Sequence, residues 1–134
     1  MFEPHITKDD LPLSFGSFKP TGHVVVVFPE DATADELAQS LREHGVDEAD
    51  IVRLTPEEVV ERFKPLLPEA SGASGFGSEI QSMRQMYLLA LEGHGLMIIR
   101  VRDDEVQERV AQAARQGRAT LAKKYGMLTI EELI

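Results

Sequence analysis

Residues 22–31, GHVVVVFPED, and residues 93–104, GHGLMIIRVRDD, are the two stretches that decide the fold. In each, a Gly-His pair precedes an apolar run and an acidic pair follows it. The first run, Val24 to Phe28, has the length and β-branched composition of a strand, and Pro29 ends it. A strand that is apolar at every position is buried on both faces. We therefore expect this strand to lie inside a sheet that is covered on both sides.

Helical patterns follow both runs. Thr33 stands three residues before Glu36, which is the spacing of a capping box, and Gly45 supplies a helix stop. After a second short strand at 51–54, a further capping box with proline at the first helical position opens at Thr55. Helices are also predicted from Ser78 to about Glu92 and from the acidic pair Asp103–Asp104 to Gly117, and a third strand over Leu96–Val101. A fourth strand is predicted within 119–128, followed by a last helical turn that Thr129 and Glu132 cap.

The second half of the chain repeats the first. Three landmarks recur in the same order, Gly22 as Gly93, Gly45 as Gly117 and Leu54 as Leu128, at offsets of 71, 72 and 74 residues. Such a repeat indicates two copies of a strand, helix, strand unit.

Two such units in one sheet predict an α+β fold, a ferredoxin-like split βαβ sandwich with strands 1 and 3 central and both long helices on one face. We expect one domain over residues 1–134. Its expected parts are an irregular, partly mobile N-terminal arm (1–22), a first βαβ unit (23–54), a helical, Gly-rich insertion between strands 2 and 3 (55–95) and a second βαβ unit (96–134). The sheet face opposite the two long helices then needs cover, either from the inserted helices or from a second subunit.

The Gly-rich stretch from Gly72 to Ser78 opens a helix, where free backbone amides and the helix dipole favour an anion. Its glycine spacing fits neither a dinucleotide fingerprint nor a P-loop, so a plain connector is the competing interpretation. The candidate ligand-binding residues are Ser74, Gly75, Gly77, Ser78 and His94.

His94, at the start of the third strand, is expected to lie near Glu30 at the end of the first, so an acid-base pair of these two side chains is conceivable. A strand-edge histidine bonded to the backbone is the ordinary alternative. The four histidines stand singly and the chain has no cysteine. We therefore assign no catalytic residue, no metal site and no cofactor from the sequence.

The charge and hydropathy of the chain restrict its partners. A net charge of −9 repels phosphate backbones, so nucleic acid is not an expected partner. The longest apolar run is far shorter than the roughly 20 residues of a membrane span. The N-terminal residues do not resemble a secretory signal, and we expect a cytoplasmic protein.

The pattern of residues 22–54, from GHVVVVFPED to ADIVRL, resembles the bacterial heat-induced, general stress-protein domain. The resemblance implies a small ferredoxin-like module in a stress-associated cytoplasmic setting. It also implies a Gly-rich stretch between the halves, which Gly72, Gly75 and Gly77 could echo. It carries no assigned activity and no catalytic residues.

Two functions remain in competition. The first is a non-enzymatic module that acts through homodimerisation, protein contacts or a small regulatory ligand, anionic if it binds at the Gly-rich loop. The second is a small enzyme with a sheet-edge pocket near His94, Glu30 and the loop from Gly72 to Ser78.

Overall fold

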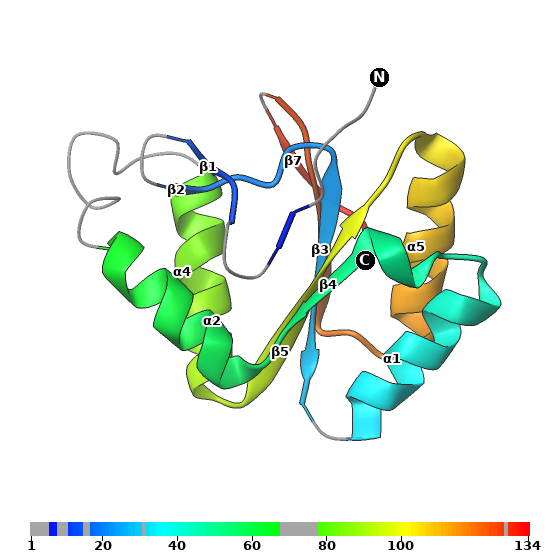
Figure 1. Cartoon of the computed structure of the whole chain (residues 1–134), viewed down its shortest axis with the longest axis horizontal. Coiled ribbons are helices and arrows are strands. Elements are labelled where there is room, and N and C mark those ends of the chain that lie inside the picture. The colour runs from blue at the N-terminus through cyan, green and yellow to red at the C-terminus, as the bar shows by residue number, and fades with distance from the viewer. Residues whose placement is uncertain (1–5, 8–10, 15–16, 31, 68–77, 128) are drawn as a thin grey trace.

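The computed structural model describes residues 6–7, 11–14, 17–30, 32–67, 78–127 and 129–134. A central sheet carries a pair of helices against each of its faces (Figure 1). The strands are β1 (Leu13–Ser14), β2 (Ser17–Phe18), β3 (His23–Pro29), β4 (Ile51–Leu54), β5 (His94–Arg100), β6 (Leu121–Tyr125) and β7 (Ile130–Glu132). The helices are α1 (Ala32–Glu43), α2 (Pro56–Phe63), α4 (Ser78–Leu91) and α5 (Asp104–Gln116), with short 3-10 helices at Glu48–Asp50 and Lys64–Leu66.

The main sheet has five strands in the order β4-β5-β3-β6-β7, and every neighbouring pair is antiparallel. The two apolar runs of the sequence, β3 and β5, pair over seven residues, with Val24 opposite Ile99 and Val27 opposite Leu96. Each of them has a second strand on its other side, β6 beside β3 and β4 beside β5. The apolar runs therefore lie inside the sheet, as predicted.

Alternation along β3 divides its side chains between two hydrophobic cores. Val24, Val26 and Phe28 pack in the core under α1 and α5, whereas Val25 and Val27 pack in the core under α2 and α4. Both long helices of the repeated units thus cover one face, as expected. The inserted helices α2 and α4 cover the other face, which decides between the two covers that the sequence left open.

The capping box predicted for α2 is present, whereas α1 begins before the N-cap predicted for it. Thr55 accepts a hydrogen bond from the Glu58 amide, and the Glu58 carboxylate accepts one from the Thr55 amide, so the predicted capping box is present. Helix α1 begins at Ala32, so Thr33 lies in its first turn and not at its N-cap. Gly45, which follows α1, has φ +81° and supplies the predicted helix stop.

The predicted C-terminal helical turn is wrong. Ile130–Glu132 form strand β7, which pairs antiparallel with β6 and is joined to it by a turn in which the Gly126 amide donates to the Thr129 carbonyl (2.8 Å). Ile130 packs against the core under α2 and α4. Pairing with β6 satisfies a row of backbone groups and buries Ile130 as well, which outweighs the capping pattern of Thr129 and Glu132.

The N-terminal arm is more ordered than its composition predicts. Its strands β1 and β2 pair as a two-stranded hairpin, and Phe18 is fully buried against Phe63 and Tyr125, with ring centroids 5.0 and 6.0 Å away. The Gly22 amide donates to the Tyr125 carbonyl, which ties the end of the arm to β6. Within the arm, Leu13–Ser14 and Ser17–Phe18 therefore form regular structure, and the buried Phe18 side chain anchors β2 to the core.

Candidate functional site

The structure tests only part of the predicted ligand-binding loop. Ser74, Gly75 and Gly77 lie outside the described residues, and Ser78 is the first residue of α4. Helix α4 runs from there along the sheet, and its N-terminal half lies near β7 (Figure 1). The amides at the start of α4 thus lie at that end of the sheet.

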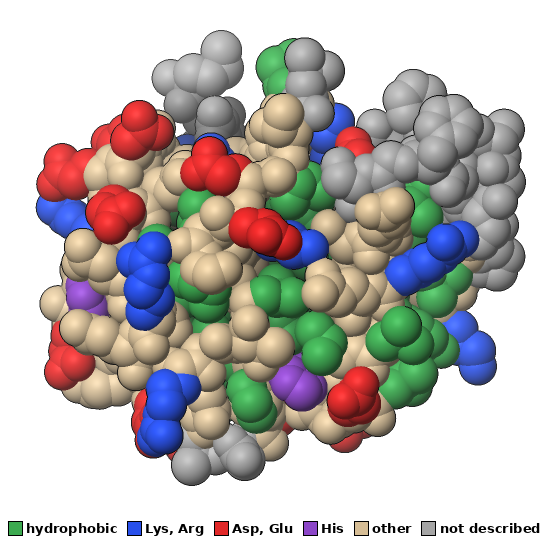
Figure 2. Space-filling view, turned by 180° about the vertical axis from the view of Figure 1, so that it is seen from behind, with side chains coloured by type: hydrophobic (Ala, Val, Ile, Leu, Met, Phe, Trp, Pro, Cys, Tyr) green, Lys and Arg blue, Asp and Glu red, His purple; other side chains and the backbone are tan. Residues whose placement is uncertain are grey.

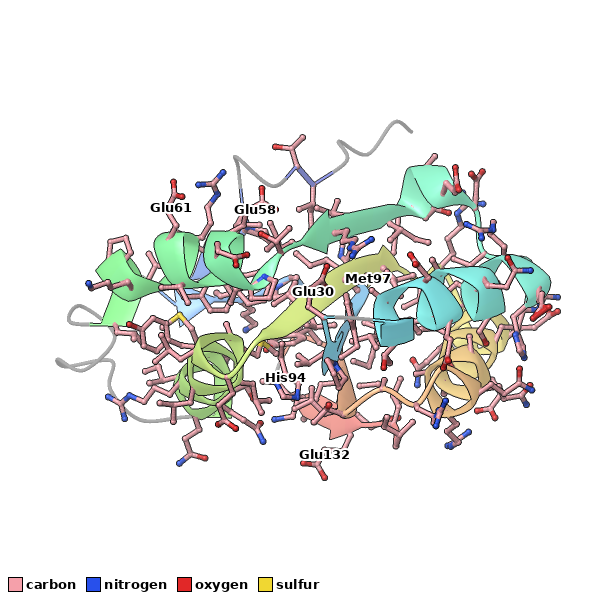
Figure 3. The ribbon with its side chains drawn as sticks, turned by 90° about the horizontal axis from the view of Figure 1, so that it is seen from below. Glu30, Glu58, Glu61, His94, Met97 and Glu132 are labelled. Carbon is pink, nitrogen blue, oxygen red and sulfur yellow. The ribbon has the colours of Figure 1, made fainter. Side chains whose placement is uncertain are left out.

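His94 and Glu30 do not form the conceivable acid-base pair. The backbones meet as expected, because Pro29 is the register partner of His94 and the Glu30 amide donates to the Gly93 carbonyl. The side chains have other partners: His94 Nδ1 donates to the Leu89 carbonyl (3.1 Å), and Glu30 forms an ion pair with Arg53. The two labelled side chains are separated in Figure 3. This is the ordinary backbone-bonded histidine that the sequence also allowed.

Glu30 instead lies in an open cleft of about 590 Å³ at the end of the sheet, between the start of α2 and the end of α4. Its walls are acidic and apolar, and they comprise Glu30, Thr55, Pro56, Glu57, Val60, Glu61, Ala90, Leu91 and Gly93. Glu30 Oε2 is buried and has no hydrogen-bond partner, while Oε1 is bonded to Arg53. Among the described residues, the lining holds three carboxylates and the Thr55 hydroxyl but no histidine, lysine or serine.

A second cleft, of about 650 Å³, lies between α4 and the β6–β7 edge of the sheet. We call it the Lys123 cleft, and its lining residues are Gln81, Ser82, Gln85, Lys123, Ile130 and Glu132. Three of these are neutral polar side chains from α4. Of the described residues in its lining, Ile130 alone has a wholly aliphatic side chain. This cleft is the more polar of the two and has a cation in its wall.

Lys123 and Tyr125 leave β6 on the same face of the sheet, the one that α2 and α4 cover. Helices α1 and α5 cover the other face. Lys123 therefore points towards α4. Only 9% of Lys123 is exposed. Its ammonium donates to Ser82 Oγ (3.1 Å) and to Gln85 Oε1 (2.8 Å), which are both neutral. In the part of the chain that the structure describes, no carboxylate lies within ion-pair distance of it. Buried charges in proteins are ordinarily paired, so an ammonium with no counterion among the described residues is unusual.

Tyr125 adds a second polar group under the same part of α4. The residue is fully buried and its hydroxyl has no well-formed hydrogen bond to any described residue. Burial raises the pKa of the Tyr125 phenol far above its usual value, and an interaction with Ser82 opposes this only in part. Ser82, itself buried, therefore lies close to both Lys123 and Tyr125.

Sequence reasoning missed Lys123, which it interpreted only as an interruption of the fourth strand. One signal was present. Alternation over residues 121–125 places Lys123 between Leu121 and Tyr125 on one face, which is an apolar face in the rest of the sheet. A lysine at such a position either lies at the edge of the core, where its ammonium reaches solvent, or is buried for a function. Which of these holds depends on where α4 lies.

Comparisons with family models, with curated proteins and with solved structures find no match for this chain. In the described residues, no three His, Asp or Glu side chains converge as metal ligands would. None of the helices described has both the length and the apolar character that a membrane crossing requires.

Proposed function

We propose that this chain is a ferredoxin-like, non-enzymatic module that binds a small anion in the Lys123 cleft. The four strands of the two repeated units stand in the order second, third, first, fourth (β4-β5-β3-β6), each antiparallel to its neighbours, which supports a ferredoxin-like fold. Strand β7 is an addition at the edge, and it supplies one wall of the cleft. The fold itself does not define the function, so the proposal rests on the site.

The observation that carries the proposal is the buried Lys123 ammonium with only neutral partners. An anion bound in the cleft would accept the remaining ammonium hydrogen and supply the missing negative charge. Gln81, Gln85 and Ser82 would supply further hydrogen bonds from the α4 wall. The sequence offered an anion site at the loop that precedes α4 only as an alternative to a plain connector.

The enzymatic alternative has less support. It placed the chemistry at His94, Glu30 and the Gly-rich loop. His94 bonds the Leu89 carbonyl and is not among the residues that line the Glu30 cleft. The Glu30 carboxylate is held in an ion pair with Arg53, which stabilises its charged form and makes it a poor proton acceptor. Binding is the simpler role for both clefts.

Ligand screening tests the proposal. Purified protein would be titrated with acetate, succinate, L-leucine, inorganic phosphate and phosphoserine, with thermal unfolding and calorimetry as readouts. We expect at least one of these carboxylates or phosphates to raise the Tm of the wild type and to lose its effect in Lys123→Met. Lys124→Met is the matched control, because Lys124 is the next residue of β6 and lies on the opposite face. The proposal fails if none of the anions binds, or if binding survives Lys123→Met.

Homodimerisation and a stress-associated, cytoplasmic role stay part of the proposal. Because α2 and α4 cover the second sheet face, a dimer would have to use another surface. Hydrophobic side chains gather on the side of the molecule that α4 forms (Figure 2), where Leu88 and Leu91 are 58% and 57% exposed. Light scattering at micromolar concentration tests this directly, since a mass of one 14.9 kDa chain would refute the dimer.

A further inference from the structure

A second charged group, Glu132 of β7, lines the Lys123 cleft. Lys123 and Glu132 are register partners in the β6–β7 pair, so their side chains leave the same face of the sheet. They nevertheless form no ion pair, because the ammonium is bonded to Ser82 and Gln85 on α4. The Glu132 side chain has no hydrogen bond or ion pair with any residue that the structure describes. Figure 3 shows it at the outer edge, projecting away from the protein.

The cleft thus offers a cation at its buried side and a carboxylate without a partner at its open side. We propose that its ligand is a small zwitterion, an α-amino acid with an aliphatic side chain. The ligand's carboxylate accepts hydrogen bonds from the Lys123 ammonium, and its ammonium group donates to Glu132. Its side chain packs on Ile130, the apolar part of the wall. This inference rests on the proposed anion site and specifies the chemistry of its ligand.

The charges favour a zwitterion over a phosphate or a dicarboxylate. One ammonium balances one negative charge, and the Glu132 carboxylate would repel a second. Phosphate sites commonly use the planar fork of arginine, and the described residues that line this cleft include no arginine. The whole chain carries a net charge of −9, which repels an anion at long range but has little effect on a neutral zwitterion.

Calorimetry with three related probes tests the inference. L-leucine carries both charges, N-acetyl-L-leucine only the carboxylate, and L-leucinamide only the ammonium. We expect leucine to bind about tenfold more tightly than L-leucinamide, which loses the hydrogen bond to the buried Lys123. It should bind about two- to fivefold more tightly than N-acetyl-L-leucine, because Glu132 is exposed and solvent screens its ion pair. Glu132→Gln should weaken leucine by a similar factor and leave N-acetyl-L-leucine unchanged. Glu131→Gln is the matched control, because Glu131 is paired with Lys124 on the other face.

The outcomes separate this inference from the proposed function. If N-acetyl-L-leucine binds as tightly as leucine, or if Glu132→Gln weakens both equally, the zwitterion is refuted and the anion site stands. If phosphate alone binds and depends on Lys123, the ligand class is likewise wrong. If neither the leucine probes nor the other anions bind, the proposed function fails and the inference fails with it.

Discussion

Replacement of Lys123 by methionine distinguishes a lysine kept for binding from one that holds the fold together. Methionine has a similar length and no charge, and its flexible chain can keep most of the apolar contact that the lysine stem makes. Burial of the lysine ammonium costs several kcal/mol, of the order found for buried ions after relaxation. Its two hydrogen bonds, to Ser82 and Gln85, return about 1.5–3 kcal/mol each.

These contributions nearly cancel. Loss of a partner for the buried Ser82 hydroxyl adds a cost of about 1 kcal/mol, and Gln85 is exposed enough to bond water. We therefore expect Lys123→Met to change the free energy of unfolding by less than about 2 kcal/mol, in either direction, while anion binding is lost. A group whose removal costs little stability but abolishes binding is a binding residue.

Urea unfolding followed by circular dichroism measures this free energy. The slope of the free energy against urea concentration is compared between variants, to confirm that each exposes the same surface on unfolding. Lys124→Met, at a half-buried position on the opposite face of β6, should lie within about 1 kcal/mol of the wild type, because methionine keeps the apolar contact of the lysine stem. A loss of more than about 3 kcal/mol in Lys123→Met alone would refute the reasoning. Such a loss would show that the hydrogen bonds from Lys123 to Ser82 and Gln85 stabilise the fold.

Three further predictions follow from the packing. Gly117→Ala should destabilise the protein by about 1–3 kcal/mol, because a Cβ there would lie 2.8 Å from the Leu37 backbone. Gly126→Ala should cost less in the same urea experiment, because the nearest atoms to a Cβ there are 3.4 Å away. Phe18→Ala should cost about 3–5 kcal/mol by the same measurement; a value under 1 kcal/mol would mean that the N-terminal hairpin is not part of the core. The raised pKa of Tyr125 means that the unfolded chain loses this proton first, so stability should fall as the pH rises above about 10. This loss should be smaller in Tyr125→Phe, and equal slopes in the two proteins between pH 9 and 11 would contradict it.

Much of the fold is readable from the sequence because its signals are local. The run from Val24 to Phe28 is apolar at every position, so it must be covered on both faces wherever it lies. The capping box at Thr55 uses groups three residues apart and needs no tertiary contact. The same kind of signal failed at Thr129 and Glu132, where a non-local partner, strand β6, was available.

The candidate site could not be predicted in this way. Ser82 and Lys123 are 41 residues apart, and they meet only because α4 packs over the β6 side of the sheet. The sequence places a lysine in a strand but does not show which helix lies above it. His94 and Glu30, in contrast, were correctly placed at one end of the sheet by strand register, yet their side chains bond to other groups.

By itself, the sequence determined two strand, helix, strand units, a sheet with apolar strands inside it and the need for a cover on both faces. Only the tertiary structure decided that α2 and α4 supply the second cover, that Phe18 anchors the N-terminal hairpin and that β7 extends the sheet. The same packing buries Lys123 against Ser82 and Gln85, with no ion-pair partner in the part of the chain that the structure describes. The physical reason is that burial and charge pairing depend on contacts between distant segments, whereas hydrophobic periodicity and helix caps are properties of a few consecutive residues.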